Sequence, residues 1–234
     1  MHLEPRLFFD LNKFAHTDLF SQSEPAFHVL IGGIEKYLLA HLNSKENRLE
    51  GDVSPQAFIN GTGIVIEKGA IVEPGAFIQG PTWIGVGTVV RHGAYVRGNV
   101  ITGRDCIIGH ATEIKNSVML NNARAGHFAY VGDSVLGNDV NLGAGTKLAN
   151  FRMDQKMIKV RAQGTVFVTG LTKMGSILGD GVQTGCNSVL NPGTILAKGC
   201  SVFPCISIHG VHLTKTEFQK NTHFGEPFAR ASTF

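Results

Sequence analysis

Aliphatic side chains recur at every sixth position along the centre of the chain. From position 66 to 120 the series reads Ile66, Val72, Ile78, Ile84, Val90, Val96, Thr102, Ile108, Ile114 and Leu120. Four positions after each residue, a second series is small or slender, with Ala70, Ala76, Thr82, Thr88, Ala94, Val100, Cys106, Thr112 and Val118. Six residues make one short strand and a turn, and three such faces make one triangular coil of about 18 residues. The pattern predicts an all-β fold, a left-handed parallel β-helix of hexapeptide repeats.

The repeat changes frame once and then continues. It resumes as Leu136, Leu142 and Leu148, and after an interruption it returns in the same frame as Leu178, Thr184, Leu190, Leu196 and Val202. An ordinary β-sandwich is the alternative, but sandwich strands do not keep one period through so many units. We therefore expect one prism with aliphatic residues inside and glycine or asparagine at its turns.

Segments outside the repeat divide the chain into three regions. Residues 1–50 are predicted to form an N-terminal helical cap, with an amphipathic helix from Ser23 to Asn43 covering the N-terminal end of the prism. Residues 51–205 form the β-helix, interrupted by a basic loop over residues 151–175. Residues 206–234 form a polar C-terminal arm. A long loop inside a compact fold is more often functional than not.

Composition narrows the classes of partner and compartment. The net charge of +3 is too small to indicate a nucleic-acid-binding protein. The longest apolar stretch, residues 30–42, is broken by charged side chains, so we expect no membrane span. Four cysteines without disulfide or metal spacing predict reduced thiols and a cytoplasmic protein; they are Cys106, Cys186, Cys200 and Cys205.

Stacking of the coils brings two cations together. Residues 18 apart lie one above the other, about 5 Å apart, and Lys115 follows Arg97 by 18 residues. Two cations at that separation repel by about 3 kcal/mol at an effective dielectric constant of 20. A bound anion, above all a phosphate, would relieve the repulsion. The alternative is a solvated charge ladder in which Glu113 offsets part of it.

The densest polar cluster, Ala125 to Asp133, lies at the frame break. His127 is its candidate general base, because imidazole exchanges protons near neutral pH. The neighbouring Arg124, Tyr130 and Asp133 favour a catalytic role over an idle surface histidine.

A zinc site is the rival interpretation of the same histidine. His92, His110 and His127 follow one another at intervals of 18 and 17 residues, which would stack three imidazoles. Hexapeptide carbonic anhydrases instead place two histidines close in sequence on one coil, and this chain lacks that pair. We therefore expect no metal, and a zinc content near one per subunit would overturn that expectation.

Four segments in a fixed order carry a family resemblance: Val96-Arg97, Thr112 to Ser117, Ala125 to Asp133, and Asn138 to Thr146, followed by Asn150. Together they resemble the acetyltransferase domain of bifunctional glucosamine-1-phosphate N-acetyltransferase/UDP-N-acetylglucosamine pyrophosphorylase. The resemblance covers residues 96–150, and the rest of the prism matches only as generic hexapeptide repeat.

The resemblance implies an activity and a role for individual residues. It implies a homotrimer with active sites between subunits, in which the amine of a hexosamine-1-phosphate, glucosamine-1-phosphate above all, attacks acetyl-CoA without a metal. It implies His127 as general base, Arg97 and Lys115 as phosphate ligands, Tyr130 as a phosphate or sugar contact, Asn141 and Asn150 as residues orienting the sugar and amine, and the Ala144 N–H as oxyanion donor. Ala144, Cys186 and Lys173 are the candidate acetyl-CoA contacts.

Two departures from that family leave other functions open. Nothing before Gly51 resembles a nucleotidyltransferase domain, so we expect no UDP-sugar synthesis by this chain alone. The basic loop after Asn150 resembles related sugar-1-phosphate nucleotidyltransferases, some of which acetylate both glucosamine- and galactosamine-1-phosphate. One alternative is an acyltransferase acting on a nucleotide sugar, which would not bind a free sugar-1-phosphate. The other is a non-catalytic scaffold subunit for a separate sugar nucleotidyltransferase, which would bind no CoA thioester.

Overall fold

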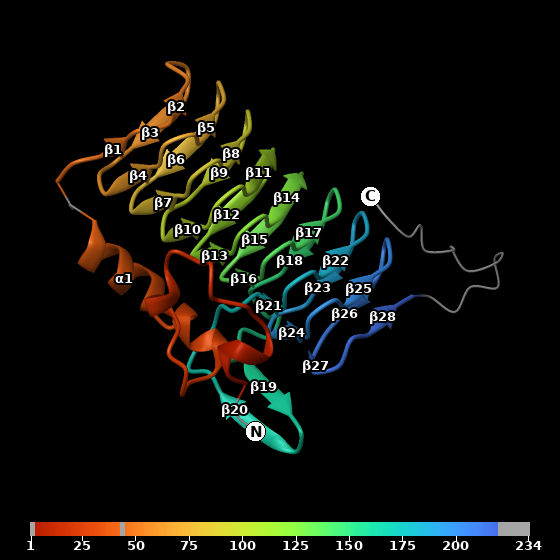
Figure 1. The fold of residues 1–234 in the computed structure, drawn as a ribbon. Helices are drawn as coiled ribbons and strands as arrows, with labels where there is room; N and C mark the ends of the chain where they lie inside the picture. Colours follow the sequence, from red (N-terminus) through yellow and green to blue (C-terminus); the bar gives the residue numbers. More distant parts are fainter. Residues whose placement is uncertain (1–2, 43–44, 220–234) are drawn as a thin grey trace.

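Three parallel sheets form the faces of a prism, and the chain passes from one face to the next at each corner (Figure 1). The computed structural model describes residues 3–42 and 45–219. Within these ranges the sheets contain nine, nine and eight strands, and a further pair forms a separate hairpin. The predicted left-handed parallel β-helix is confirmed.

The three faces are named sheets A, B and C. Sheet A consists of β1 (Arg48–Leu49), β4 (Ile64–Ile66), β7 (Thr82–Ile84), β10 (Val100–Thr102), β13 (Ser117–Met119), β16 (Val135–Leu136), β21 (Ser176–Leu178), β24 (Thr194–Leu196) and β27 (Val211–His212). Sheet B consists of β2 (Asp52–Val53), β5 (Ile71–Val72), β8 (Val89–Val90), β11 (Ile107–His110), β14 (Arg124–His127), β17 (Asn141–Leu142), β22 (Gln183–Thr184), β25 (Ser201–Val202) and β28 (Glu217–Phe218). Sheet C consists of β3 (Phe58–Asn60), β6 (Phe77–Gln79), β9 (Tyr95–Val96), β12 (Glu113–Lys115), β15 (Tyr130–Gly132), β18 (Lys147–Leu148), β23 (Val189–Leu190) and β26 (Ser207–Ile208).

The six-residue series is the core of the prism. Its aliphatic members, such as Ile66, Ile84 and Ile114, are fully buried. Coils early in the prism are 18 residues long, as in the pairing of Ile78 with Val96. The frame change consists of two successive coils of 17 residues each, seen in sheet B where Ile107 pairs with Arg124 and Arg124 with Asn141. One residue is therefore lost per coil, and stacking continues without a gap.

The N-terminal region is less helical than predicted. It contains three short 3₁₀ turns, η1 (Pro5–Leu7), η2 (Thr17–Leu19) and η3 (Ala26–Leu30), and one α-helix, α1 (Gly33–His41). The expected helix from Ser23 is wrong in its first half, because Gly32 adopts a left-handed conformation with φ of +70° and becomes the N-cap of α1. The predicted end at Asn43 lies outside the described residues.

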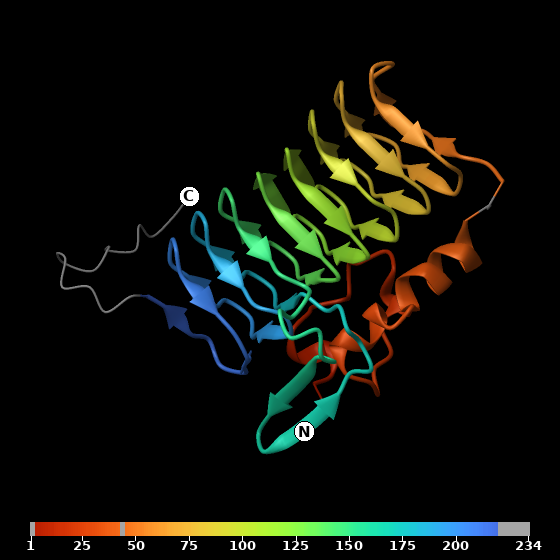
Figure 2. The same ribbon diagram turned by 180° about the vertical axis from the view of Figure 1, so that it is seen from behind.

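This N-terminal layer covers the side of the prism and not its end (Figures 1 and 2). Its apolar residues share a cluster with the outward side chains of sheet A, including Ile101, Val118, Val135, Ile177 and Ile195. The position predicted from the need for an end cap is therefore wrong. The physical reason is that the outer face of sheet A is aliphatic, so it gains more from burial than the end coil does.

The insertion in the β-helix is a hairpin and not an irregular loop. Strands β19 (Lys159–Ala162) and β20 (Thr165–Val168) pair in antiparallel register. Val160 and Ala162 are buried in the same cluster as the N-terminal layer, and Phe27 meets Phe167 edge-on at 6.4 Å. The predicted interruption of the coils is confirmed: Val135 in β16 pairs directly with Ile177 in β21.

The prism extends further than predicted at both ends. It begins at Arg48 and continues through β26, β27 and β28 to Phe218. The last turn was missed because its coil is short: Ser201 pairs with Glu217, a step of 16 residues. The predicted polar arm therefore does not apply to residues 206–218, and residues 220–234 lie outside the described part of the chain.

Candidate active site

The outer face of sheet C carries two columns of polar side chains on neighbouring strands. Tyr95, Glu113 and Tyr130 stand in register on β9, β12 and β15. Two positions further along, the same register places Lys115 opposite Arg97, whose N–H donates to the carbonyl of Ile114 at 2.9 Å. The stacking of the two cations is as the sequence arithmetic predicted.

Each of these cations has its own carboxylate partner. Arg97 Nη1 lies 2.6 Å from Glu113 Oε1, and Lys115 Nζ lies 2.8 Å from Asp133 Oδ2. The Arg97–Glu113 pair is substantially exposed, whereas the side chains of Lys115 and Asp133 are only 19% and 7% exposed. The two ion pairs offset the predicted repulsion, so a bound anion is not needed to hold the cations in place.

Asp133 joins the polar residues of this face into one network. Its carboxylate accepts hydrogen bonds from Lys115 Nζ and Asn116 Nδ2, both at 2.8 Å, and from Asn150 Nδ2. A buried carboxylate with three donors holds those donors in fixed positions. Sequence reasoning named Asp133 only as a neighbour of His127; its position 18 residues after Lys115 was the available signal.

Tyr130 and Asn150 meet above Gly132. A Cβ atom at Gly132 would lie 2.7 Å from both the Tyr130 hydroxyl and Asn150 Nδ2, so only glycine fits there. Burial raises the pKa of Tyr130, and the charges of Glu113 and Asp133 raise it further. The phenol therefore keeps its proton at neutral pH and is available as a hydrogen-bond donor.

His127 lies at the corner where sheet B turns into sheet C. It ends β14 in register with His110 on β11, and its ring is exposed. None of the described residues hydrogen-bonds with this ring. The N–H of Gly145 donates to the His127 carbonyl at 3.0 Å, which places Ala144 beside it on the next coil. The Ala144 N–H has no acceptor among the described residues, so an imidazole and an unused N–H donor are close together at this corner.

The remaining candidates are spread over the surface. Cys186 is exposed at the same corner as Ala144, on the next coil, where the neighbouring Asn187 N–H donates to the Ala144 carbonyl at 2.8 Å. Asn141 lies on sheet B, in register with Arg124. Lys173 forms an isolated bridge with Phe151 and so lies at the corner between sheets C and A, at the opposite end of the sheet C strands from Ala144.

The three histidines of the zinc interpretation do not form a metal site. The rings of His92 and His110 stack with centroids 4.1 Å apart, and His110 Nδ1 contacts the His92 carbonyl at 3.0 Å. Among the described residues, no three His, Cys, Asp or Glu side chains are placed to hold a metal ion. In the same part of the chain, no helix is long and apolar enough to cross a membrane.

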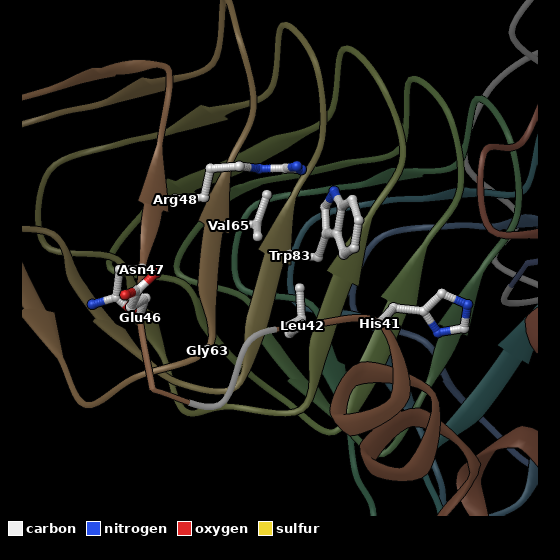
Figure 3. Close-up of a pocket in the computed structure, with 8 residues that line it drawn as sticks. All are labelled: His41, Leu42, Glu46, Asn47, Arg48, Gly63, Val65 and Trp83. Carbon is white, nitrogen blue, oxygen red and sulfur yellow. The ribbon is translucent and has the colours of Figure 1, made fainter.

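A hollow of about 390 Å³ lies away from this network, near the start of the prism (Figure 3). Arg48 reaches over the Trp83 ring, 5.5 Å from its centroid, and Val65 lies between the two strands that carry them. Leu42 and His41, from the end of α1, complete one side. The hollow opens on sheet A and contains no residue of the network on sheet C.

Comparison with known proteins places the chain among sugar-modifying transferases. A family model described as "GMPPB C-terminal domain" matches residues 78–199. The bifunctional sugar-1-phosphate nucleotidylyltransferase/acetyltransferase of Sulfurisphaera tokodaii is 35% identical over 171 residues, which are 73% of this chain and 42% of that protein. A putative uncharacterized acetyltransferase of Escherichia coli, YaiX, is 31% identical over 169 residues, which are 71% of this chain and 73% of that protein.

A solved structure shares the fold at lower similarity. The hexapeptide transferase family protein from Anaplasma phagocytophilum is 20% identical, with a TM-score of 0.38, over 68% of this chain and 74% of that one. The chain spans less than half the length of the bifunctional relative, in agreement with the predicted resemblance to an acetyltransferase region. The chain belongs to the GMPPB C-terminal domain family and is a hexapeptide-repeat acyltransferase.

Proposed function

We propose that this protein is an acetyl-CoA-dependent N-acetyltransferase of a hexosamine-1-phosphate, with glucosamine-1-phosphate as its preferred acceptor. The network on sheet C is the observation that carries the proposal: it holds Arg97, Lys115 and Tyr130 on one face, with Asn150 beneath. Cations and a neutral phenol suit a sugar phosphate. Both cations are already paired, so the phosphate adds to or replaces a carboxylate contact when it binds.

The corner beside this face supplies the groups that acyl transfer needs. His127 takes a proton from the sugar ammonium or amine as nitrogen attacks the thioester carbonyl. The Ala144 N–H donates to the oxyanion of the tetrahedral intermediate, a contact worth about 3 kcal/mol in comparable sites. The C–S bond then breaks, the CoA thiolate leaves and accepts the proton, and the amide remains on the sugar. Asn141 and Asn150 orient the acceptor, and Cys186 and Lys173 contact acetyl-CoA.

The proposal includes a homotrimer with active sites between subunits. Sheet C supports this assembly, because it exposes an aromatic ladder at its N-terminal end. Phe58 and Tyr95 are 60% and 41% exposed, and Phe77 packs between them with ring centroids 6.2 and 5.4 Å away. Exposed aromatic residues of this kind are typical of protein interfaces. The four cysteines are unpaired, which supports work in the reducing cytoplasm, where acetyl-CoA is made.

A substrate panel tests the proposal. Thiol release from acetyl-CoA is measured with glucosamine-1-phosphate, galactosamine-1-phosphate and UDP-glucosamine as acceptors. We expect the highest kcat/KM with glucosamine-1-phosphate and none without an acceptor. Turnover with UDP-glucosamine alone would replace the proposed acceptor by a nucleotide sugar. Absence of turnover with every acceptor would leave the scaffold role.

A further inference from the structure

A second cavity, of about 760 Å³, lies between the inserted hairpin and the last coils of the prism. The free edge of β19 forms one wall, and the corner residues Asn191 and His209 form the other. This volume is within the range of sites that hold drug-sized or nucleotide-sized ligands. None of the catalytic groups of the proposed function lies in its wall.

The lining of this cavity is basic and its charge is not neutralised. Arg152, Lys159, Arg161 and His209 line it, against one carboxylate, that of Asp154. Asp154 is already held by Arg152, with contacts of 2.8 and 2.6 Å. Lys159 and Arg161 are exposed and form no ion pair with the described residues.

The hairpin aims these two cations in one direction. Along β19 the residues alternate, with Lys159 and Arg161 exposed and Val160 and Ala162 buried. Side chains two residues apart on a strand lie on the same face, about 7 Å apart. That spacing suits two phosphate groups of one ligand, or a diphosphate and a separate monoester.

The cavity continues the corner that carries the phosphate-binding candidates. Leu148 pairs with Leu190, and Leu190 with Ile208, so Ala149, Asn191 and His209 follow one another along the corner between sheets C and A. Lys115 and Asn150 occupy the same corner on earlier coils. Two coils, about 10 Å at strand spacing, therefore separate the coil of Asn150 from that of His209.

We propose that this cavity binds the phosphate-bearing nucleotide end of acyl-CoA, with Lys159 and Arg161 as ligands of the 3′-phosphate and diphosphate. The proposal rests on the proposed acyl-CoA-dependent function. Of the two substrates, only the CoA thioester has several phosphates at the end remote from its reacting carbon. Its flexible arm spans the distance from the cavity to the His127 corner. Phe151, 45% exposed, and Met153, fully exposed, border the cavity and offer apolar surface to the base.

Binding of CoA without any acceptor tests this directly. Calorimetry is carried out with CoA and with dephospho-CoA, which lacks the 3′-phosphate, on the wild-type protein and on Lys159→Gln/Arg161→Gln. We expect the double variant to bind CoA about 30-fold more weakly and to lose most of the preference for CoA over dephospho-CoA. The matched control Lys36→Gln/Lys68→Gln removes two exposed charges elsewhere and should bind both as the wild type does.

The outcomes separate this proposal from the proposed function. A double variant that binds CoA within twofold of the wild type, with its circular dichroism unchanged, overturns the cavity assignment even if acetyl transfer is normal. CoA binding that depends on Lys159 and Arg161 in a protein without acetyl transfer supports the cavity and refutes the function. Absence of CoA binding by the wild-type protein overturns both.

Discussion

Sheets A and C are built from the same repeat but serve different purposes. The inward residues of both are aliphatic and fully buried, for example Leu136 in β16 and Val131 in β15. The outward residues differ. In sheet A they are Ile101, Val118 and Val135, all buried under the N-terminal layer. In sheet C the corresponding positions are tyrosine, glutamate and lysine, and they stay open to ligands or to a second subunit.

The difference shows that the hexapeptide repeat fixes the scaffold and leaves function to the outward positions. Inward positions must fit a narrow interior, so they tolerate few side chains. Outward positions carry no such restriction. Aliphatic residues there attract a covering layer, whereas charged residues keep the face open and build a site.

The largest expected effect comes from placing a charge on the covered face. Val135→Asp should lower the free energy of unfolding by about 4 kcal/mol, because the carboxylate would be buried without a partner. The matched control Ile71→Asp introduces the same group on the open face of sheet B, where Ile71 is 42% exposed, and should cost less than about 1 kcal/mol. Urea unfolding measures both. Equal losses would contradict the distinction between a covered and an open face.

The covered face should also make stability depend on pH. His16, in the N-terminal layer beside Trp83, is 4% exposed. Burial lowers its pKa from 6.5 to about 4, and the charge of His41 lowers it further in the same direction. Between these values the unfolded chain binds more protons than the folded one, so stability falls as pH falls, by about 3 kcal/mol from pH 7 to pH 4.

The variant His16→Gln isolates this contribution. It should remove most of that slope in urea unfolding measured between pH 7 and pH 4, whereas His92→Gln, at an exposed position, should leave the slope unchanged. An unaltered slope in His16→Gln would show that other groups cause the acid sensitivity.

A smaller loss is expected from the open face, where one buried carboxylate organises the network. Asp133→Asn should reduce stability by about 2 kcal/mol, because Lys115 loses its partner and remains largely buried. It should also weaken sugar phosphate binding, since Lys115 and Asn150 lose their common anchor. Asp154→Asn breaks an exposed ion pair with Arg152 and should leave the urea midpoint unchanged. Similar effects of the two substitutions would refute the central role of Asp133.

The sequence was sufficient for what repeats along one dimension. The period of six placed Arg97 on Lys115 and His127 after His110, because each coil adds a nearly constant number of residues. It could not place the N-terminal layer on sheet A, since docking depends on the summed apolar area of five strands far apart in sequence. Nor did it show that Asp133 turns inward, because this depends on a left-handed corner with φ of +47°. The hairpin in residues 151–175 was missed because its strands are charged on one side.

Acetyl transfer by His127→Ala tests the account most directly. The wild-type protein and the variant are compared for thiol release from acetyl-CoA with glucosamine-1-phosphate, after both are shown to have the same circular dichroism and oligomeric state. His127 is exposed and makes no side-chain contact that holds the fold, so we expect kcat to fall by about 10²- to 10⁴-fold with stability unchanged. A variant that turns over at the wild-type rate would contradict the assignment of His127 as the general base.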